Sequence, residues 1–274
     1  MNGLVKKTLI GLLWLWLFWA AFWVSLDGDR LARLLENQWP ANLGVLKISS
    51  LETRLFGLTA QSLVLNGPGE LVTGPVAISF APWHLLLGRV GFEAELYQGK
   101  LAGVVSIWGP ELIYEARGIL PNRHAELRKM RLITSNPVLS AQGRHGLLSG
   151  EGQSEISLIQ VSISGNPSQT GLPLEMPDTS LSRVVLTGEL KGNELKLNVN
   201  TQGDFGGQLD GTIQINRQTP QLSQLNLKLS GQFAPELESR LGLVATLIQG
   251  YRDPAGHIGL SIEGPLQMPQ VRKL

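Results

Sequence analysis

An uncharged stretch near the amino terminus constrains this chain more than any other feature. Residues 8–26 have the sequence TLIGLLWLWLFWAAFWVSL, which is 19 residues long and contains no charge. A helix of this length spans about 28 Å, close to the hydrocarbon thickness of a bilayer. Lys6 and Lys7 precede it, so residues 1–7 are expected to stay in the cytoplasm while the rest crosses. The expected anchor contains four of the seven tryptophans: Trp14, Trp16, Trp19 and Trp23.

Two other interpretations of residues 8–26 are a cleaved signal peptide and a buried helix of a soluble domain. A cleavable signal usually has a shorter apolar core that ends in small residues, whereas Phe22, Trp23 and Leu26 are bulky. A soluble helix rarely buries four tryptophans without a polar face. We therefore expect an uncleaved single-pass anchor, with the carboxyl-terminal part of the chain on the far side of the membrane.

Composition excludes several classes of function. The chain has no cysteine, which rules out disulfide scaffolds, thiolate metal sites and cysteine nucleophiles. Its net charge is +1 with no basic patch, which argues against nucleic acid as a partner. The four histidines lie far apart, without the spacing of metal ligands, and no pair of carboxylates stands out as an acid–base couple. We expect no enzyme activity, no metal and no cofactor.

The hydrophobic period changes along the chain and divides it into segments. Residues 27–40 have helical spacing and predict a juxtamembrane helix. From Gly44 the period is about two, as in strands. We expect a first β half over residues 41–165, a connection over 166–180 and a second β half over 181–274. The strands predicted in the first half are 45–50, 55–65, 71–80, 89–97, 100–108, 112–119, 138–148 and 152–163.

The second half shows the clearest alternation. Four of its segments place aliphatic side chains on one face and polar ones on the other, and one of them carries Leu209, Ile213 and Ile215. The aliphatic set, our candidate apolar concave face, is Leu195, Leu197, Val199, Leu225, Leu227, Leu229, Ile258, Leu260 and Ile262. One amphipathic helix is expected over residues 235–248, and short helical segments over 82–88 and 122–130.

The alternation predicts a mainly β fold. About twelve one-sided strands are expected, but the few soluble helices cannot cover so long an apolar face. The transmembrane helix is therefore followed by a curved antiparallel sheet with a few short helices. The sheet is a half-pipe, a sandwich or a partly open barrel. Its apolar side is either filled by side chains or able to hold acyl chains.

Several motifs resemble a known family. They are Pro82-Trp83-His84-Leu85-Leu86-Leu87-Gly88-Arg89, Leu96-Tyr97-Gln98-Gly99-Lys100-Leu101-Ala102-Gly103, Leu172-Pro173-Leu174, and the ending from Gly256 to Pro269. With the amino-terminal anchor, they make the chain similar to the type II secretion system protein N (GspN) family, in its deltaproteobacterial-type branch. The ending also resembles the closing strand of AsmA- and TamB-like envelope proteins.

The resemblance implies a non-enzymatic, accessory or scaffold component of the type II machinery that exports folded proteins. It also implies that the anchor lies in a bacterial inner membrane and the carboxyl-terminal part of the chain in the periplasm. The partners of such a component would be other type II secretion subunits, on the inner-membrane platform or on the secretin side. The alternative is an AsmA-like lipid-handling protein, in which an apolar groove holds acyl chains and lipid is the ligand. A continuous unfilled apolar groove would distinguish the second function from the first.

Overall fold

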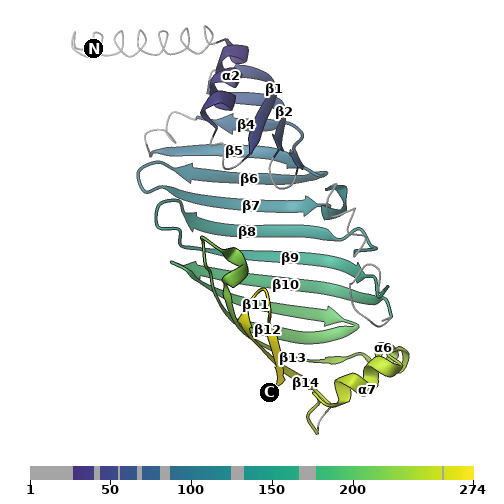
Figure 1. Cartoon of the computed structure of the whole chain (residues 1–274). Helices are drawn as coiled ribbons and strands as arrows, with labels where there is room; N and C mark the ends of the chain where they lie inside the picture. Colours follow the sequence, from purple (N-terminus) through teal and green to yellow (C-terminus); the bar gives the residue numbers. More distant parts are fainter. Residues whose placement is uncertain are drawn as a thin grey trace, which may run out of the picture. The chain divides into compact units, whose positions relative to one another are not determined.

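The computed structural model describes residues 27–39, 44–54, 56–66, 70–80, 87–124, 133–166, 177–254 and 256–274. Its strands form one open antiparallel sheet of 15 strands, in the order β1-β2-β4-β5-β6-β7-β8-β9-β10-β11-β12-β13-β14-β15, with β3 beside β2 (Figure 1). The mainly β, antiparallel fold is therefore confirmed. The described chain divides into two compact units, the first up to Leu96 with Ala102–Trp108, the second Tyr97–Leu101 with Gly109–Leu274.

The first unit combines one helix with the early strands. Its elements are α2 (Gly28–Gln38), β1 (Val45–Arg54), β2 (Gly57–Asn66), β3 (Glu70–Val72), β4 (Val76–Ser79), β5 (Arg89–Leu96) and most of β6 (Gly99–Ser106). The single strand expected over residues 71–80 is wrong: it is two strands, β3 and β4. Gly74 and Pro75 interrupt the ladder because proline has no N–H to donate to it.

Helix α2 lies along β1, the first strand of the sheet. Asp27 caps the helix by accepting a hydrogen bond from the Asp29 N–H at 3.0 Å. The Ile48 N–H of β1 donates to Glu36 Oε1 at 2.7 Å, and Ala32 is buried with Leu51. The helix therefore covers an edge that would otherwise present unpaired backbone groups.

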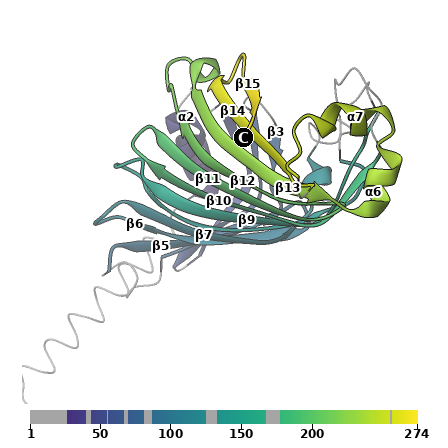
Figure 2. The same cartoon turned by 90° about the horizontal axis from the view of Figure 1, so that it is seen from below.

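The second unit contains the longer strands. They are β7 (Glu111–Ile119), β8 (Val138–Gly146), β9 (Gly152–Ile163), β10 (Thr179–Lys191), β11 (Glu194–Gly203), β12 (Phe205–Gln214), β13 (Gln224–Phe233), β14 (Ile258–Pro265) and β15 (Gln270–Lys273). Two single-turn helices, η2 (Pro121–Arg123) and η3 (Pro220–Leu222), lie in connections. Figure 2 shows that strands β9 to β13 bend along their length, so the sheet of this unit is curved.

The helix expected over residues 235–248 is two helices, α6 (Pro235–Arg240) and α7 (Leu243–Gln249), so the single-helix prediction is wrong. Gly242 separates them with φ of 53°, a left-handed conformation that ends α6. Leu237, Leu241 and Val244 are buried together and pack with Phe233 at the end of β13. The pair forms a small local core at one end of the strands (Figure 2).

Some predictions fall on residues that the structure does not describe. The four tryptophans of the expected anchor lie outside the described residues, as does most of the helical segments expected at 82–88 and 122–130. Within the described part of the chain, no helix is both long and apolar enough to cross a bilayer.

Candidate functional site

The apolar face of the second unit is built by strict register between neighbouring strands. In an antiparallel pair, directly opposed residues point to the same side of the sheet. One such row joins Leu197 of β11, Gly211 of β12, Leu227 of β13 and Ile262 of β14. The rows on either side begin at Leu195 and Val199 and run through the same strands. These rows contain eight residues of the candidate apolar set, and the ninth, Ile258, lies on the same face opposite Gly231 in the next row.

The same face continues over strands that lie outside the candidate apolar set. β12 adds Leu209 and Ile213 between the predicted strands β11 and β13. Further rows run back through β10, β9 and β8 to β7. The aliphatic residues that these rows add are Leu112, Ala116, Leu139, Ala141, Ile156, Leu158, Val184, Leu186 and Leu190. The apolar face therefore extends from β7 to β14, and we call it the apolar face below.

Most of the apolar face is only half-buried. Leu195, Leu197 and Val199 are of intermediate exposure, and none of the described helices or strands packs extensively on β10, β11 or β12 from this side. By contrast, Leu225 and Leu227 are buried although β13 makes extended contacts only with β12 and β14 among the described elements. Burial without a covering element is expected on the inner side of a curved sheet, where neighbouring side chains converge.

The opposite face is polar. Residues that alternate with the apolar set include Lys196 and Asn200 on β11, Gln208 on β12, and Asn226 and Lys228 on β13. Their side chains are exposed. The sheet of this unit therefore separates an apolar side from a solvated side, as expected for antiparallel strands.

Three polar side chains interrupt the apolar face on β7, β8 and β9. Tyr114 Oη lies 3.0 Å from Ser154 Oγ, and His145 Nε2 lies 2.8 Å from the same oxygen. The rings of Tyr114 and His145 are nearly parallel, with an interplanar angle of 9° and centroids 5.9 Å apart. All three residues are partly buried. We call Tyr114, His145 and Ser154 the polar trio.

The polar trio was not predicted from the sequence, where the histidines were considered only as metal ligands and found too far apart. Its members are 9 to 40 residues apart in sequence, so only strand pairing brings them together. The one local signal is that Gly143 and Gly152 stand where an alternating strand would place apolar side chains on this face.

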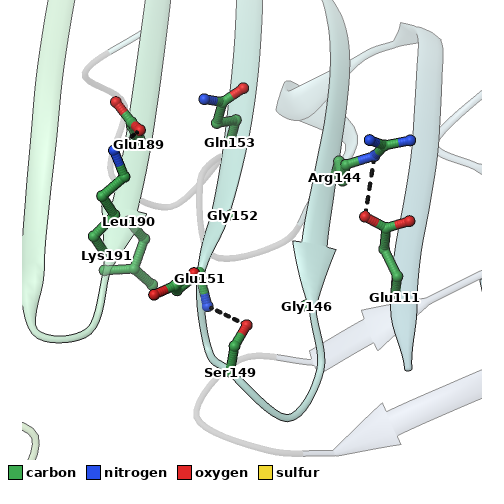
Figure 3. Close-up of a pocket in the computed structure, with 10 residues that line it drawn as sticks. All are labelled: Glu111, Arg144, Gly146, Ser149, Glu151, Gly152, Gln153, Glu189, Leu190 and Lys191. Atoms are coloured by element: carbon green, nitrogen blue, oxygen red, sulfur yellow. Dashed lines mark hydrogen bonds and ion pairs between the residues drawn. The ribbon is translucent and has the colours of Figure 1, made fainter. Parts of the chain in front are cut away.

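A shallow pocket of about 270 Å³ lies on the polar side, near the β8–β9 turn (Figure 3). Arg144 Nε lies 3.1 Å from Glu111 Oε1, and Lys191 Nζ lies 2.6 Å from Glu189 Oε1. Lys191 holds the pKa of the Glu189 carboxyl below its ordinary value, by hydrogen bonding and by charge. Each cation of the pocket is thus matched with a carboxylate, and the pocket offers no surplus positive charge for an anion.

The described residues show no group of three or more histidine, aspartate or glutamate side chains that could hold a metal ion. The arrangement that stands out chemically is therefore the apolar face with its polar trio. It defines a class of protein, an open antiparallel sheet with one long apolar side. In comparisons with known proteins, the chain matches no family model, no curated protein and no solved structure.

Proposed function

We propose that the second unit binds the acyl chains of lipids on its apolar face and handles lipids of the bacterial envelope. The observation that supports this proposal is the continuity of the apolar face from β7 to β14, together with its half-buried state. Contiguous apolar surface of this extent is rare on soluble domains and usually marks a binding site. Covering it contributes about 25 cal/mol for each Å² removed from water.

The dimensions of the apolar face suit acyl chains. Eight strands at a spacing of about 4.8 Å extend across roughly 34 Å. An acyl chain spans half of a hydrocarbon core of about 30 Å, so it reaches about 15 Å. Chains laid across the strands, or along the curve of the sheet, would fit within the face. The absence of charged side chains in the central rows of β11 to β13 also matches an aliphatic ligand.

One end of the strands in the second unit offers a lipid a route onto the apolar face. The β8–β9, β12–β13 and β14–β15 connections lie at the same end of the strands, because successive strands are antiparallel. Each connection exposes large apolar side chains, namely Leu147, Leu148, Leu222, Leu266 and Met268. Leu148 is 85 % exposed, so its side chain contributes almost nothing to the fold and is available to a lipid surface.

Photo-crosslinking in intact cells tests the proposal. A benzophenone amino acid is placed on β11 at Leu197 or Val199, which face the apolar side, or at Lys196 or Asn200, which face the polar side. We expect lipid adducts, identified by mass spectrometry, at Leu197 and Val199 alone. Lipid adducts at all four positions, or at none, would contradict the proposal.

The second candidate is the accessory function in type II secretion that the family resemblance implies. It is favoured by the exposed polar face, whose side chains such as Lys196 and Asn200 are free to contact another protein. In the same experiment, protein adducts at Lys196 and Asn200, identified as secretion subunits, would support this function. Such adducts without lipid at Leu197 and Val199 would replace the lipid-handling proposal.

A further inference from the structure

We infer that the polar trio binds the oxygen-bearing part of an acyl lipid, whose chains lie on the adjoining apolar face. This inference rests on the proposed function and names the group that the face recognises. The ligand class is a lipid with hydrogen-bond acceptor oxygens, either ester carbonyls or phosphate. The trio is a polar interruption of the apolar face, and the three rows through Leu195, Leu197 and Val199 carry only aliphatic residues and glycine from β10 to β14.

Glycines make room for the two rings. A Cβ at Gly143 would lie 2.8 Å from both Cε1 and the hydroxyl of Tyr114, whose ring crosses strand β8 at that residue. A Cβ at Gly152 would lie 2.0 Å from His145 Nδ1. Neither glycine has the positive φ that would require glycine for conformational reasons. Both are therefore best explained by the space that Tyr114 and His145 need to reach Ser154.

The hydrogen-bond inventory leaves the trio with a spare donor. A serine hydroxyl accepts two hydrogen bonds and donates one. The Tyr114 hydroxyl, the Ser154 hydroxyl and the neutral His145 imidazole each carry one proton to donate. The two contacts at Ser154 Oγ use two of these three donors, whichever atom donates in each contact, so one donor remains for an acceptor outside the protein. Where the imidazole proton is on Nε2 and Tyr114 donates to Ser154 Oγ, the remaining donor is the Ser154 O–H. In an apolar setting, where water competes less, this bond is stronger than at an exposed site.

The location of the trio suits a lipid. His145 is the penultimate residue of β8, and Gly152 opposite it begins β9, so the trio lies close to the end of these strands. That end leads to the β8–β9 turn with its exposed Leu147 and Leu148. A lipid whose polar part bonds to Ser154 would extend its chains across β10 to β12. Ser154 is directly opposite Gly188 of β10, which has no side chain to obstruct this path.

A Ser–His contact of 2.8 Å also occurs in hydrolases, but here it lacks the other parts of such a site. No carboxylate is recorded on His145 among the described hydrogen bonds and ion pairs, and Tyr114 bonds to the same serine oxygen. An acyl-transfer centre also needs donors around a developing oxyanion. The geometry therefore favours binding, and hydrolysis becomes an outcome of the test.

Three fluorescent probes distinguish the contributions. They are a pyrene-labelled diester phospholipid, its diether analogue, and a pyrenyl alkane without acceptor oxygens. Binding is measured with the full chain held in amphipol.

We expect Tyr114→Phe and Ser154→Ala to weaken binding of the diester phospholipid about three- to tenfold, which corresponds to the loss of one hydrogen bond. Both variants should bind the pyrenyl alkane as the unmodified chain does. If the two variants also bind the diether analogue more weakly, the trio recognises the phosphate, because the diether has no ester carbonyls. If the variants bind the diether as the unmodified chain does, the trio recognises the ester carbonyl.

The matched control is Ser157→Ala, on the same strand but on the opposite face. It should bind all three probes normally.

Unchanged diester and diether binding in both trio variants, or an equal loss for the pyrenyl alkane, would overturn this inference alone. Release of free fatty acid that requires Ser154 would replace binding by hydrolysis. Failure of the unmodified chain to bind any probe would instead overturn the proposed function. Tyr114→Phe keeps the ring over Gly143, and melting temperatures verify that each variant is folded.

Discussion

At the scale of single residues, small side chains decide which larger ones can meet. Ser154 contacts Tyr114 and His145 because glycine stands at the two positions over which those rings lie. Gly143 therefore leaves room for the polar trio without belonging to it. A methyl group there would crowd both the Tyr114 ring and the carbonyl oxygen of Gln153, at 2.8 Å each.

Gly143→Ala should destabilise the second unit. Overpacking of this kind costs about 1–3 kcal/mol, and each kcal/mol lowers the melting temperature by roughly 2–4 °C in a unit of this size. Differential scanning calorimetry measures the change. The control is Gly206→Ala on β12, where an added Cβ meets nothing within 4 Å. If both variants melt alike, the close packing of Tyr114 over Gly143 is wrong.

At the scale of elements, the two outer strands of the sheet differ in their protection. Helix α2 covers β1, and Glu36 accepts the hydrogen bond of the Ile48 N–H. β15 at the other end is short and exposed, with Arg272 and Lys273 in its four residues. Short, charged edge strands resist pairing with other chains, so the two edges are protected by different means.

Replacement of Ala32 by arginine tests the cover over β1. Ala32 is 7 % exposed against β1 and β2, and the space left for a methyl group cannot hold a long charged side chain, so α2 should be displaced. We expect faster hydrogen exchange in β1 and concentration-dependent association by sedimentation velocity. Leu34→Arg is the matched control, because Leu34 is 58 % exposed on the same helix. Equal behaviour of the two variants would mean that α2 does not protect this edge.

At the scale of the molecule, the described chain buries little of its apolar surface in one place. Its two hydrophobic clusters are small, one under α2 and one under α6 and α7. The long apolar face of the second unit is stabilised mainly by contacts between neighbouring strands. Stability and ligand binding should therefore depend on different residues of the same face.

The variants Leu227→Ala and Leu197→Ala test how much each residue contributes to stability, since both residues belong to one row of the face. Leu227 is 7 % exposed, and its truncation should cost about 2–5 kcal/mol of unfolding free energy. Leu197 is only half-buried and should cost about 1 kcal/mol. Denaturant titration measures both, and a larger loss for Leu197→Ala would show that the face around it is covered.

The alternation of single strands was enough to predict the mainly β fold and the side of each strand that is apolar. Leu195, Leu197 and Val199 share a face because side chains alternate along any extended strand, whatever lies beside it. The break of the helix expected at 235–248 was not predicted, although Gly242 is visible in the sequence. A single glycine ends a helix only where its neighbours pack so as to favour the left-handed conformation.

The sequence by itself therefore determined the class of fold and its amphipathic strands, because these depend on local periodicity. It predicted a curved sheet but left a half-pipe, a sandwich and a partly open barrel as alternatives, because alternation does not specify which strands pair. Only the tertiary structure decided that the sheet is open and that the apolar rows align from β7 to β14. It also brought Tyr114, His145 and Ser154 together, because contacts across strands depend on register, and register is set by the whole ladder.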